Sequence, residues 1–118
     1  MSDAAVPVTD THFADVFEIV AAAIPDRPAV VMGERVVSWR DFDRRANALA
    51  HDLAGLGLGA GSTVAAYLPN RPEYLETYHG AQKISAWPFN TNYRYAPDEI
   101  TYLFDNADAE AVVFDTRF

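Results

Sequence analysis

Apolar residues recur along the chain with two periods, and these periods predict its helices and strands. The first stripe has the 3.6-residue spacing of a helix and consists of Phe13, Val16, Phe17, Val20 and Ile24. Asp10 or Thr11 can cap this helix, and Pro25 ends it, because proline disfavours helical backbone in the residue before it. Two β-branched runs follow, Pro28–Met32 and Arg35–Ser38, and the Gly-Glu pair between them predicts a hairpin.

A second helix is predicted to begin after Ser38 and to end at Gly57. Asp41 follows Ser38 by three residues, which is the spacing of a capping box. The apolar face of this helix contains Phe42, Ala46, Leu49, Ala50, Leu53 and Leu56. Gly57 can adopt the left-handed backbone with which many helices end.

The rest of the chain alternates between short apolar strands and helices. The strands begin at Thr63, Trp87 and Ala111, so that each start lies 24 residues after the one before. This is the length of a βαβ unit, which forms a parallel sheet. The predicted fold class is therefore α/β, with an N-terminal helix and β-hairpin followed by a βαβαβ parallel sheet. We expect one domain over residues 11–118, preceded by a flexible arm at residues 1–10.

Polar residues follow the predicted strands at their carboxyl ends, where open parallel sheets bind ligands. Asn70 precedes Pro72 and lies three residues before Glu73, so we interpret it as a helix cap. Asn90 and Asn92 are interpreted as structural turn residues, because asparagine tolerates left-handed backbone.

Arg94 is the candidate for chemistry in the second of these loops. It lies between Tyr93 and Tyr95, and an arginine can stack on a ring while it presents its guanidinium to a phosphate or carboxylate. An ion pair with Asp98 or Glu99, at the start of the next helix, is an equally good interpretation. The residue pattern leaves both open.

Two features of the helix before Trp87 are interpreted as structural. His79-Gly80 indicates close helix packing rather than an acid–base pair. Lys83, the only lysine, lies near the end of the helix, where a cation interacts favourably with the helix dipole.

Composition and charge exclude several classes of function. The net charge of −8 over 118 residues disfavours nucleic acid and anionic membranes as partners. No cysteine is present, and the three histidines lie far apart in sequence, so we expect no metal site. No apolar run is long enough for a membrane span, and there is no secretion signal, which favours a cytoplasmic protein. The sequence contains no Ser/His/Asp set, Walker loop or GxGxxG motif, so no catalytic residue is assigned.

Several motifs in order resemble one family. The first three are Trp39-Arg40-Asp41-Phe42 with Asn47-Ala48-Leu49-Ala50, the run Gly57–Ala65, and Leu68-Pro69-Asn70 with Glu73. The last is Ser85–Tyr95 with Glu99-Ile100, in which Ser85 stands where the family pattern has glycine. Over residues 11–117 the chain resembles the N-terminal portion of AMP-forming acyl-coenzyme A synthetases, which belong to the adenylate-forming ligases.

The resemblance implies a reaction that this chain cannot complete alone. Such enzymes use ATP and Mg²⁺ to convert a carboxylic acid, here a fatty or related acid, to an acyl-adenylate, and then form the coenzyme A thioester. Arg94 matches an arginine that, in some members, lies near a phosphate of coenzyme A. The family's phosphate loop and catalytic lysine do not occur here, so we expect the chain to be an inactive fragment of the fold.

An incomplete sheet also leads us to expect self-association, most simply as a homodimer. The alternative function is a non-catalytic binding or regulatory module that reuses this fold. An independent nucleotide-binding protein is disfavoured, because the glycine loop is missing.

Overall fold

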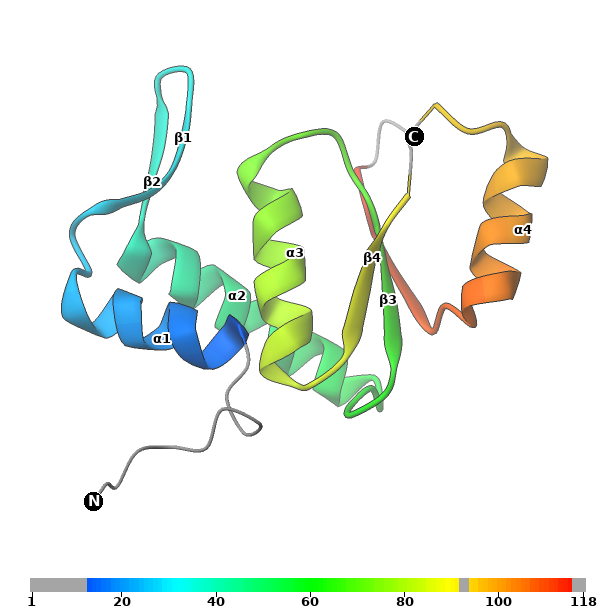
Figure 1. The fold of residues 1–118 in the computed structure, drawn as a ribbon, viewed down its shortest axis with the longest axis horizontal. Coiled ribbons are helices and arrows are strands. Elements are labelled where there is room, and N and C mark those ends of the chain that lie inside the picture. Colours follow the sequence, from blue (N-terminus) through cyan, green and yellow to red (C-terminus); the bar gives the residue numbers. More distant parts are fainter. Residues whose placement is uncertain (1–12, 92–93, 116–118) are drawn as a thin grey trace.

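The computed structural model describes residues 13–91 and 94–115, and its elements follow the predicted order (Figure 1). The helices are α1 (Phe13–Ala23), α2 (Trp39–Gly55), α3 (Pro72–Lys83) and α4 (Pro97–Ala107). The strands are β1 (Pro28–Met32), β2 (Arg35–Ser38), β3 (Thr63–Tyr67), β4 (Trp87–Asn90) and β5 (Ala111–Phe114). The predicted arm and the predicted cap at Asp10 or Thr11 lie outside the described residues.

The N-terminal part consists of α1, the hairpin and α2. Strands β1 and β2 pair antiparallel around a turn in which Gly33 has a positive φ of 60°, as predicted for the hairpin. Ser38 caps α2, because its Oγ accepts a hydrogen bond of 3.1 Å from the backbone N–H of Asp41. Gly57, with φ of 95°, follows the end of α2 and confirms the predicted helix stop.

The three remaining strands form the predicted parallel sheet, in the order β4-β3-β5. Thr63 pairs with Trp87, and Val64 pairs with Ala111, so the three strands stay nearly in register along the sheet. Central strand β3 is the most buried, and Val64, Ala65 and Ala66 are completely inaccessible. The α/β fold class is therefore confirmed.

Helices α2 and α3 cover one face of the sheet and enclose the core. The buried cluster there is formed by Leu53, Val64, Ala81 and Ala86. Gly80 lies where α3 crosses α2, and a Cβ atom on it would stand 3.0 Å from the Ala46 carbonyl oxygen. The expectation that His79-Gly80 marks close helix packing is confirmed.

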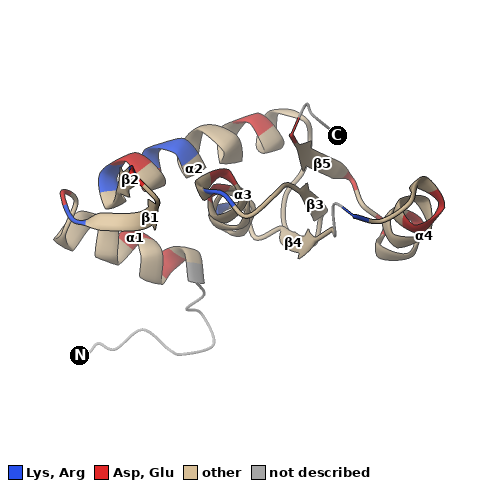
Figure 2. Cartoon of the chain, turned by 90° about the horizontal axis from the view of Figure 1, so that it is seen from above, with Lys and Arg blue, Asp and Glu red and all other residues tan. Residues whose placement is uncertain are grey.

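The opposite face of the sheet is open in the described part of the chain. Side chains alternate between the faces of a strand, so the register places Trp87, Phe89, Val112 and Phe114 on this face. Helix α4 lies beside it and contacts Phe89 through Phe104, with ring centroids 6.2 Å apart, but it has no buried residue (Figure 2). Trp87 and Phe114 are 68% and 56% exposed.

Candidate functional site

The carboxyl ends of the three parallel strands meet at one edge of the sheet, at the top in Figure 1. The backbone is continuous with the ladder there, because the Thr91 N–H donates to the Ala66 carbonyl at 3.0 Å, and the Asp115 N–H donates to the Tyr67 carbonyl at 3.3 Å. Ligands of open parallel sheets bind beyond this edge, so its residues are the first candidates for a binding site.

An ion pair connects two of the loops at this edge. The Arg71 Nη1 lies 3.2 Å from Asp115 Oδ2, and the Asp115 side chain is only 11% exposed. The pair therefore joins the loop after β3 to the end of β5. No sequence signal pairs these residues, because they are separated by 44 positions and neither belongs to a local motif.

The predicted cap at Asn70 is wrong. The residue that precedes α3 is Arg71, whose backbone is extended and whose side chain makes no capping hydrogen bond. Pro72 occupies the first helical position, and proline both forces extended backbone on the residue before it and lacks an N–H that needs a cap. Asn70 is exposed in the loop one position too early to cap the helix.

The two other asparagines have different outcomes. Asn90 belongs to β4, where it pairs with Ala66. Asn90 is the last residue of this strand, and its structural role at the start of the following loop stays a prediction. Asn92 and Tyr93 lie outside the described residues. No sequence signal indicated Thr91, which is 1% exposed and whose hydroxyl has no hydrogen-bond partner in the described part of the chain.

Arg94 is exposed on the loop that leads from β4 to α4. One of its two suggested partners has another role, because Glu99 Oε1 accepts the backbone N–H of Ala96 at 2.9 Å and so caps α4. Tyr95 lies beside Arg94 and forms a surface hollow of about 430 Å³ with residues of α4. The acidic residues Asp98 and Glu99 also line this hollow, and Arg94 itself does not.

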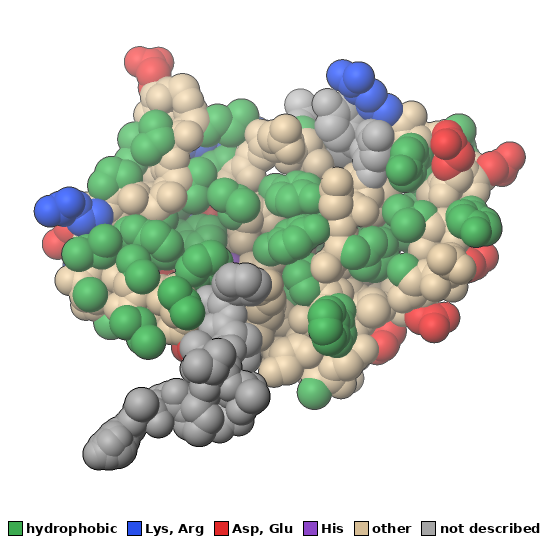
Figure 3. Space-filling view, viewed as in Figure 1, with side chains coloured by type: hydrophobic (Ala, Val, Ile, Leu, Met, Phe, Trp, Pro, Cys, Tyr) green, Lys and Arg blue, Asp and Glu red, His purple; other side chains and the backbone are tan. Residues whose placement is uncertain are grey.

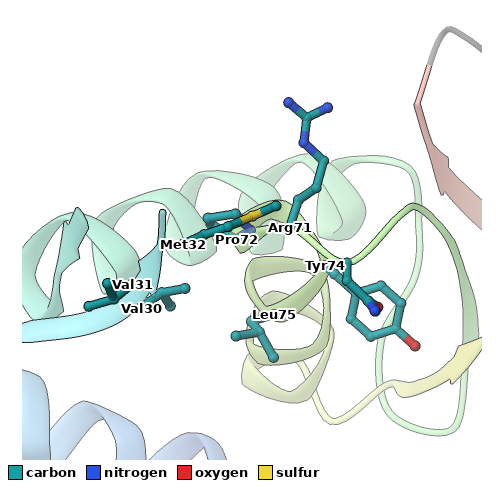
Figure 4. A pocket seen from close by; sticks show the side chains of 8 residues that line it. Val30, Val31, Met32, Arg71, Pro72, Tyr74 and Leu75 are labelled. Carbon is teal, nitrogen blue, oxygen red and sulfur yellow. The ribbon is translucent and has the colours of Figure 1, made fainter. Parts of the chain in front are cut away.

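An apolar groove lies between the hairpin and α3, and one end of it reaches the sheet edge at Asn70 and Arg71. Its two parts have volumes of about 370 and 500 Å³ and share Val30, Tyr74 and Leu75 (Figure 4). Hydrophobic side chains gather on this part of the surface (Figure 3), and Leu75 and Val31 are 48% and 64% exposed. Tyr74 stacks on Tyr78 at 5.2 Å, and burial, together with the Tyr78 hydroxyl, raises the pKa of Tyr74. The groove offers apolar contact area and few groups for chemistry.

Charged residues outside the sheet edge form structural ion pairs. Arg35 of β2 binds Glu73 of α3 through two hydrogen bonds of 3.1 and 2.8 Å, and this contact lowers the pKa of Glu73. Arg45 of α2 binds the buried Glu76 at 2.7 Å. Within residues 13–91 and 94–115 no group of three or more His, Asp or Glu residues could hold a metal ion. No helix in the same ranges is both long and apolar enough to cross a membrane.

The sequence matches one family model over most of its length. Residues 17–117 match the model described as AMP-binding enzyme, so the chain belongs to the family of AMP-binding enzymes. It is similar to a medium/long-chain-fatty-acid–CoA/3-oxocholest-4-en-26-oate–CoA ligase of Mycobacterium marinum, with 36% identity over 107 residues. The match covers 91% of this chain and 20% of that ligase, so the chain spans about a fifth of its curated relative's length.

A solved structure and a shorter relative extend the comparison. The N-terminal subdomain of Klebsiella oxytoca NpsA, in complex with 3-hydroxyanthranilyl-AMSN, superposes with a TM-score of 0.80 and 25% identity. The match covers 87% of this chain and 26% of the NpsA chain. The fold is therefore the incomplete N-terminal subdomain of adenylate-forming enzymes, as predicted. An uncharacterized protein of Mycobacterium tuberculosis is 31% identical over 110 residues, which cover 92% of this chain and 63% of that protein.

Proposed function

We propose that the chain is the N-terminal part of an ATP-dependent carboxylic acid–CoA ligase that acts on a fatty or related acid in the cytoplasm. The observation that carries the proposal is the 36% identity to a fatty-acid–CoA ligase over 91% of the chain, within a family of AMP-binding enzymes. The complete enzyme would join the acid to AMP with release of pyrophosphate. It would then transfer the acyl group to the thiol of coenzyme A with release of AMP.

The described residues fit only part of this chemistry. ATP with Mg²⁺ supplies the activating adenylyl group, but the sequence contains no loop of the kind that cradles phosphates. We therefore propose that the 118-residue chain catalyses no adenylation by itself. Arg94 fits a different part of the reaction, because its exposed guanidinium at the carboxyl edge can bind a phosphate of coenzyme A.

A chimera tests the proposal directly. Residues 17–117 of this chain would replace the matching segment of the M. marinum ligase, and acid-dependent pyrophosphate exchange and thioester formation would be measured with medium- and long-chain acids. We expect both activities in the chimera and background exchange from the isolated 118-residue chain. A folded chimera without exchange would contradict the proposed function, and exchange by the isolated chain would contradict its inactivity.

The role of Arg94 can be tested in the same chimera. Arg94→Ala should raise the apparent KM for coenzyme A about ten- to a hundredfold, since a charge-assisted hydrogen bond contributes about 1.5–3 kcal/mol. Pyrophosphate exchange should change little, and Arg94→Lys should retain part of the affinity. Equal losses in both half-reactions with a lower Tm would identify Arg94 as a structural residue instead.

The second candidate function is a non-catalytic binding or regulatory module. The observation that favours it is the M. tuberculosis relative, of which this chain covers 63%, so that this relative is itself far shorter than the ligases. A module predicts that the isolated chain binds a protein or small ligand, and that the chimera folds without activity.

Self-association of the chain is compatible with both candidate functions. Outer strands β4 and β5 and the open sheet face with Trp87 and Phe114 offer unpaired backbone and exposed rings in the described chain. Such surfaces recruit other chains. We propose that the 118-residue chain forms a homodimer through this face.

A further inference from the structure

A histidine with no role in the proposed ligase chemistry lies at the junction of three helices. His79 of α3 is completely inaccessible to solvent. Its ring stacks on Phe42 of α2 at 5.2 Å and 9°, and Phe17 of α1 meets it edge to face, also at 5.2 Å. Aromatic pairs at such separations are favourable contacts. The imidazole is therefore part of the packing that holds α1 on the other two helices.

Charged groups from all three helices surround this imidazole. His79 Nε2 lies 3.1 Å from Asp43 Oδ1 of α2, and the same oxygen lies 2.8 Å from Lys83 Nζ of α3. Lys83 also binds Glu18 of α1 at 2.5 Å. Burial opposes ionisation of Asp43, but the hydrogen bonds from Lys83 and His79 outweigh it and lower the pKa of Asp43. Asp43 is thus an anion that accepts, and His79 Nε2 carries the proton.

The second ring nitrogen has no comparable partner among the residues that the structure describes. His79 Nδ1 is buried and makes no hydrogen bond with the described residues. A proton added there would create an N–H group with no acceptor in the described part of the chain, in a ring packed between Phe17 and Phe42 and close to the Lys83 cation. Asp43 offsets only part of this cost, because Lys83 shares its oxygen. The closed arrangement of the helices therefore excludes the proton that water would supply.

Helix α1 is the element that can move away from His79. Helix α1 packs chiefly on α2 and α3, and neither sheet includes any of its residues. Moving it away would give His79 access to water while the β4-β3-β5 sheet stays paired. We propose that His79 is a buried proton sensor, which holds α1 on α2 and α3 when its imidazole is neutral and releases α1 when the imidazole is protonated.

The direction of the pH dependence follows from the closed state, in which α1 packs on α2 and α3 and covers His79. Burial lowers the pKa of His79 below its ordinary value of 6.5, and the Asp43 hydrogen bond offsets this only in part. The open state, in which His79 meets water, binds more protons than the closed state below pH 6.5. The closed state is therefore fully favoured above pH 6.5. Below pH 6.5 the equilibrium constant for closure falls by up to about tenfold for each pH unit.

Hydrogen exchange of the 118-residue chain between pH 8 and pH 5 tests the proposal. The opening constant of the α1 amides, corrected for intrinsic exchange rates, should be constant above pH 6.5 and rise up to about tenfold per unit below it. Amides of β3 should keep a constant opening constant over this range. An α1 opening constant that does not change with pH would overturn the proposal.

Two variants separate His79 from other titrating groups. His79→Gln can still donate to Asp43 but does not titrate, so its α1 opening should lose the pH dependence below 6.5. His51→Gln removes an exposed histidine of α2 and should behave like the unmodified chain. Equal pH dependence in His79→Gln and the unmodified chain would assign the effect to another group.

Imidazole ¹⁵N spectra of the unmodified chain serve if His79→Gln does not fold. At pH 7.5 they should show a protonated Nε2 and an unprotonated Nδ1 for His79. A His79 that takes up its second proton near pH 6.5 while α1 stays closed would refute the proton-sensor role.

Discussion

Arg71 and Asp115 lie 3.2 Å apart at the carboxyl edge of the sheet, although 44 positions separate them in the sequence. The Arg71 side chain is 41% exposed, whereas that of Asp115 is 11% exposed. Their contact holds the loop that leads into α3 against the end of β5. It thereby shapes the edge at which Arg94 is also exposed.

A double-mutant cycle should measure this contact. With Arg71→Ala, Asp115→Asn and the double variant, urea unfolding should give a coupling free energy of about 0.5–1 kcal/mol, because the arginine is partly solvated. Arg71→Ala alone should cost more than the coupling, since it leaves a mostly buried carboxylate without this partner. Strictly additive single effects would show that the pair contributes nothing to stability.

The backbone conformation of Ser85 leads us to expect that glycine at this position stabilises the fold. It has a φ of 61°, in the left-handed region that glycine adopts without a Cβ penalty, and it is the position at which the family pattern has glycine. Ser85→Gly should raise the free energy of unfolding by about 1 kcal/mol and Tm by about 4–8 °C. Ser85→Ala is the matched control and should give no gain, because alanine keeps the Cβ. A Tm that rises equally in both variants would exclude this explanation.

At Gly80, inside helix α3, we expect that replacing glycine destabilises the fold. Alanine favours helix by about 1 kcal/mol over glycine, but here its Cβ would lie 3.0 Å from the Ala46 carbonyl oxygen and 3.1 Å from Leu49 Cδ2. The backbone oxygen cannot move without separating α2 from α3, so Gly80→Ala should lower stability by about 1–2 kcal/mol. Gly55→Ala, with nothing within 4 Å of the new Cβ, should be neutral or slightly stabilising. Thermal unfolding of both variants checks the contrast.

Self-association can be tested by light scattering after size exclusion. The 118-residue chain should elute with a mass above that of a monomer, and this mass should fall over a hundredfold dilution. Phe114→Lys, which places a charge on the open sheet face, should shift the equilibrium toward monomer. Leu56→Lys, at an exposed site beyond α2, should not. A monomer at every concentration would mean that the open face does not drive association.

The order and type of the elements could be predicted from the sequence because they depend on local patterns. The 24-residue spacing of the strand starts reappears as register, with Thr63 beside Trp87 and Val64 beside Ala111. Ser38 and Gly57 act as predicted because a cap and a helix stop involve only neighbouring residues. Asn70 shows the limit of such rules, because two local signals competed there and Pro72 prevailed.

Only the tertiary structure decided which distant charges meet. Near the end of its helix Lys83 is expected to act on the helix dipole, but its ammonium group binds Glu18 and Asp43, and its side chain is only 5% exposed. The sequence predicts that His79 packs, yet its contact with Asp43, and an Nδ1 without a partner among the described residues, appear only when α1, α2 and α3 come together. Residue type and spacing determine local backbone geometry, because those interactions span a few positions. Ion pairs and buried imidazoles depend on how whole helices pack, and this packing is a property of the complete core.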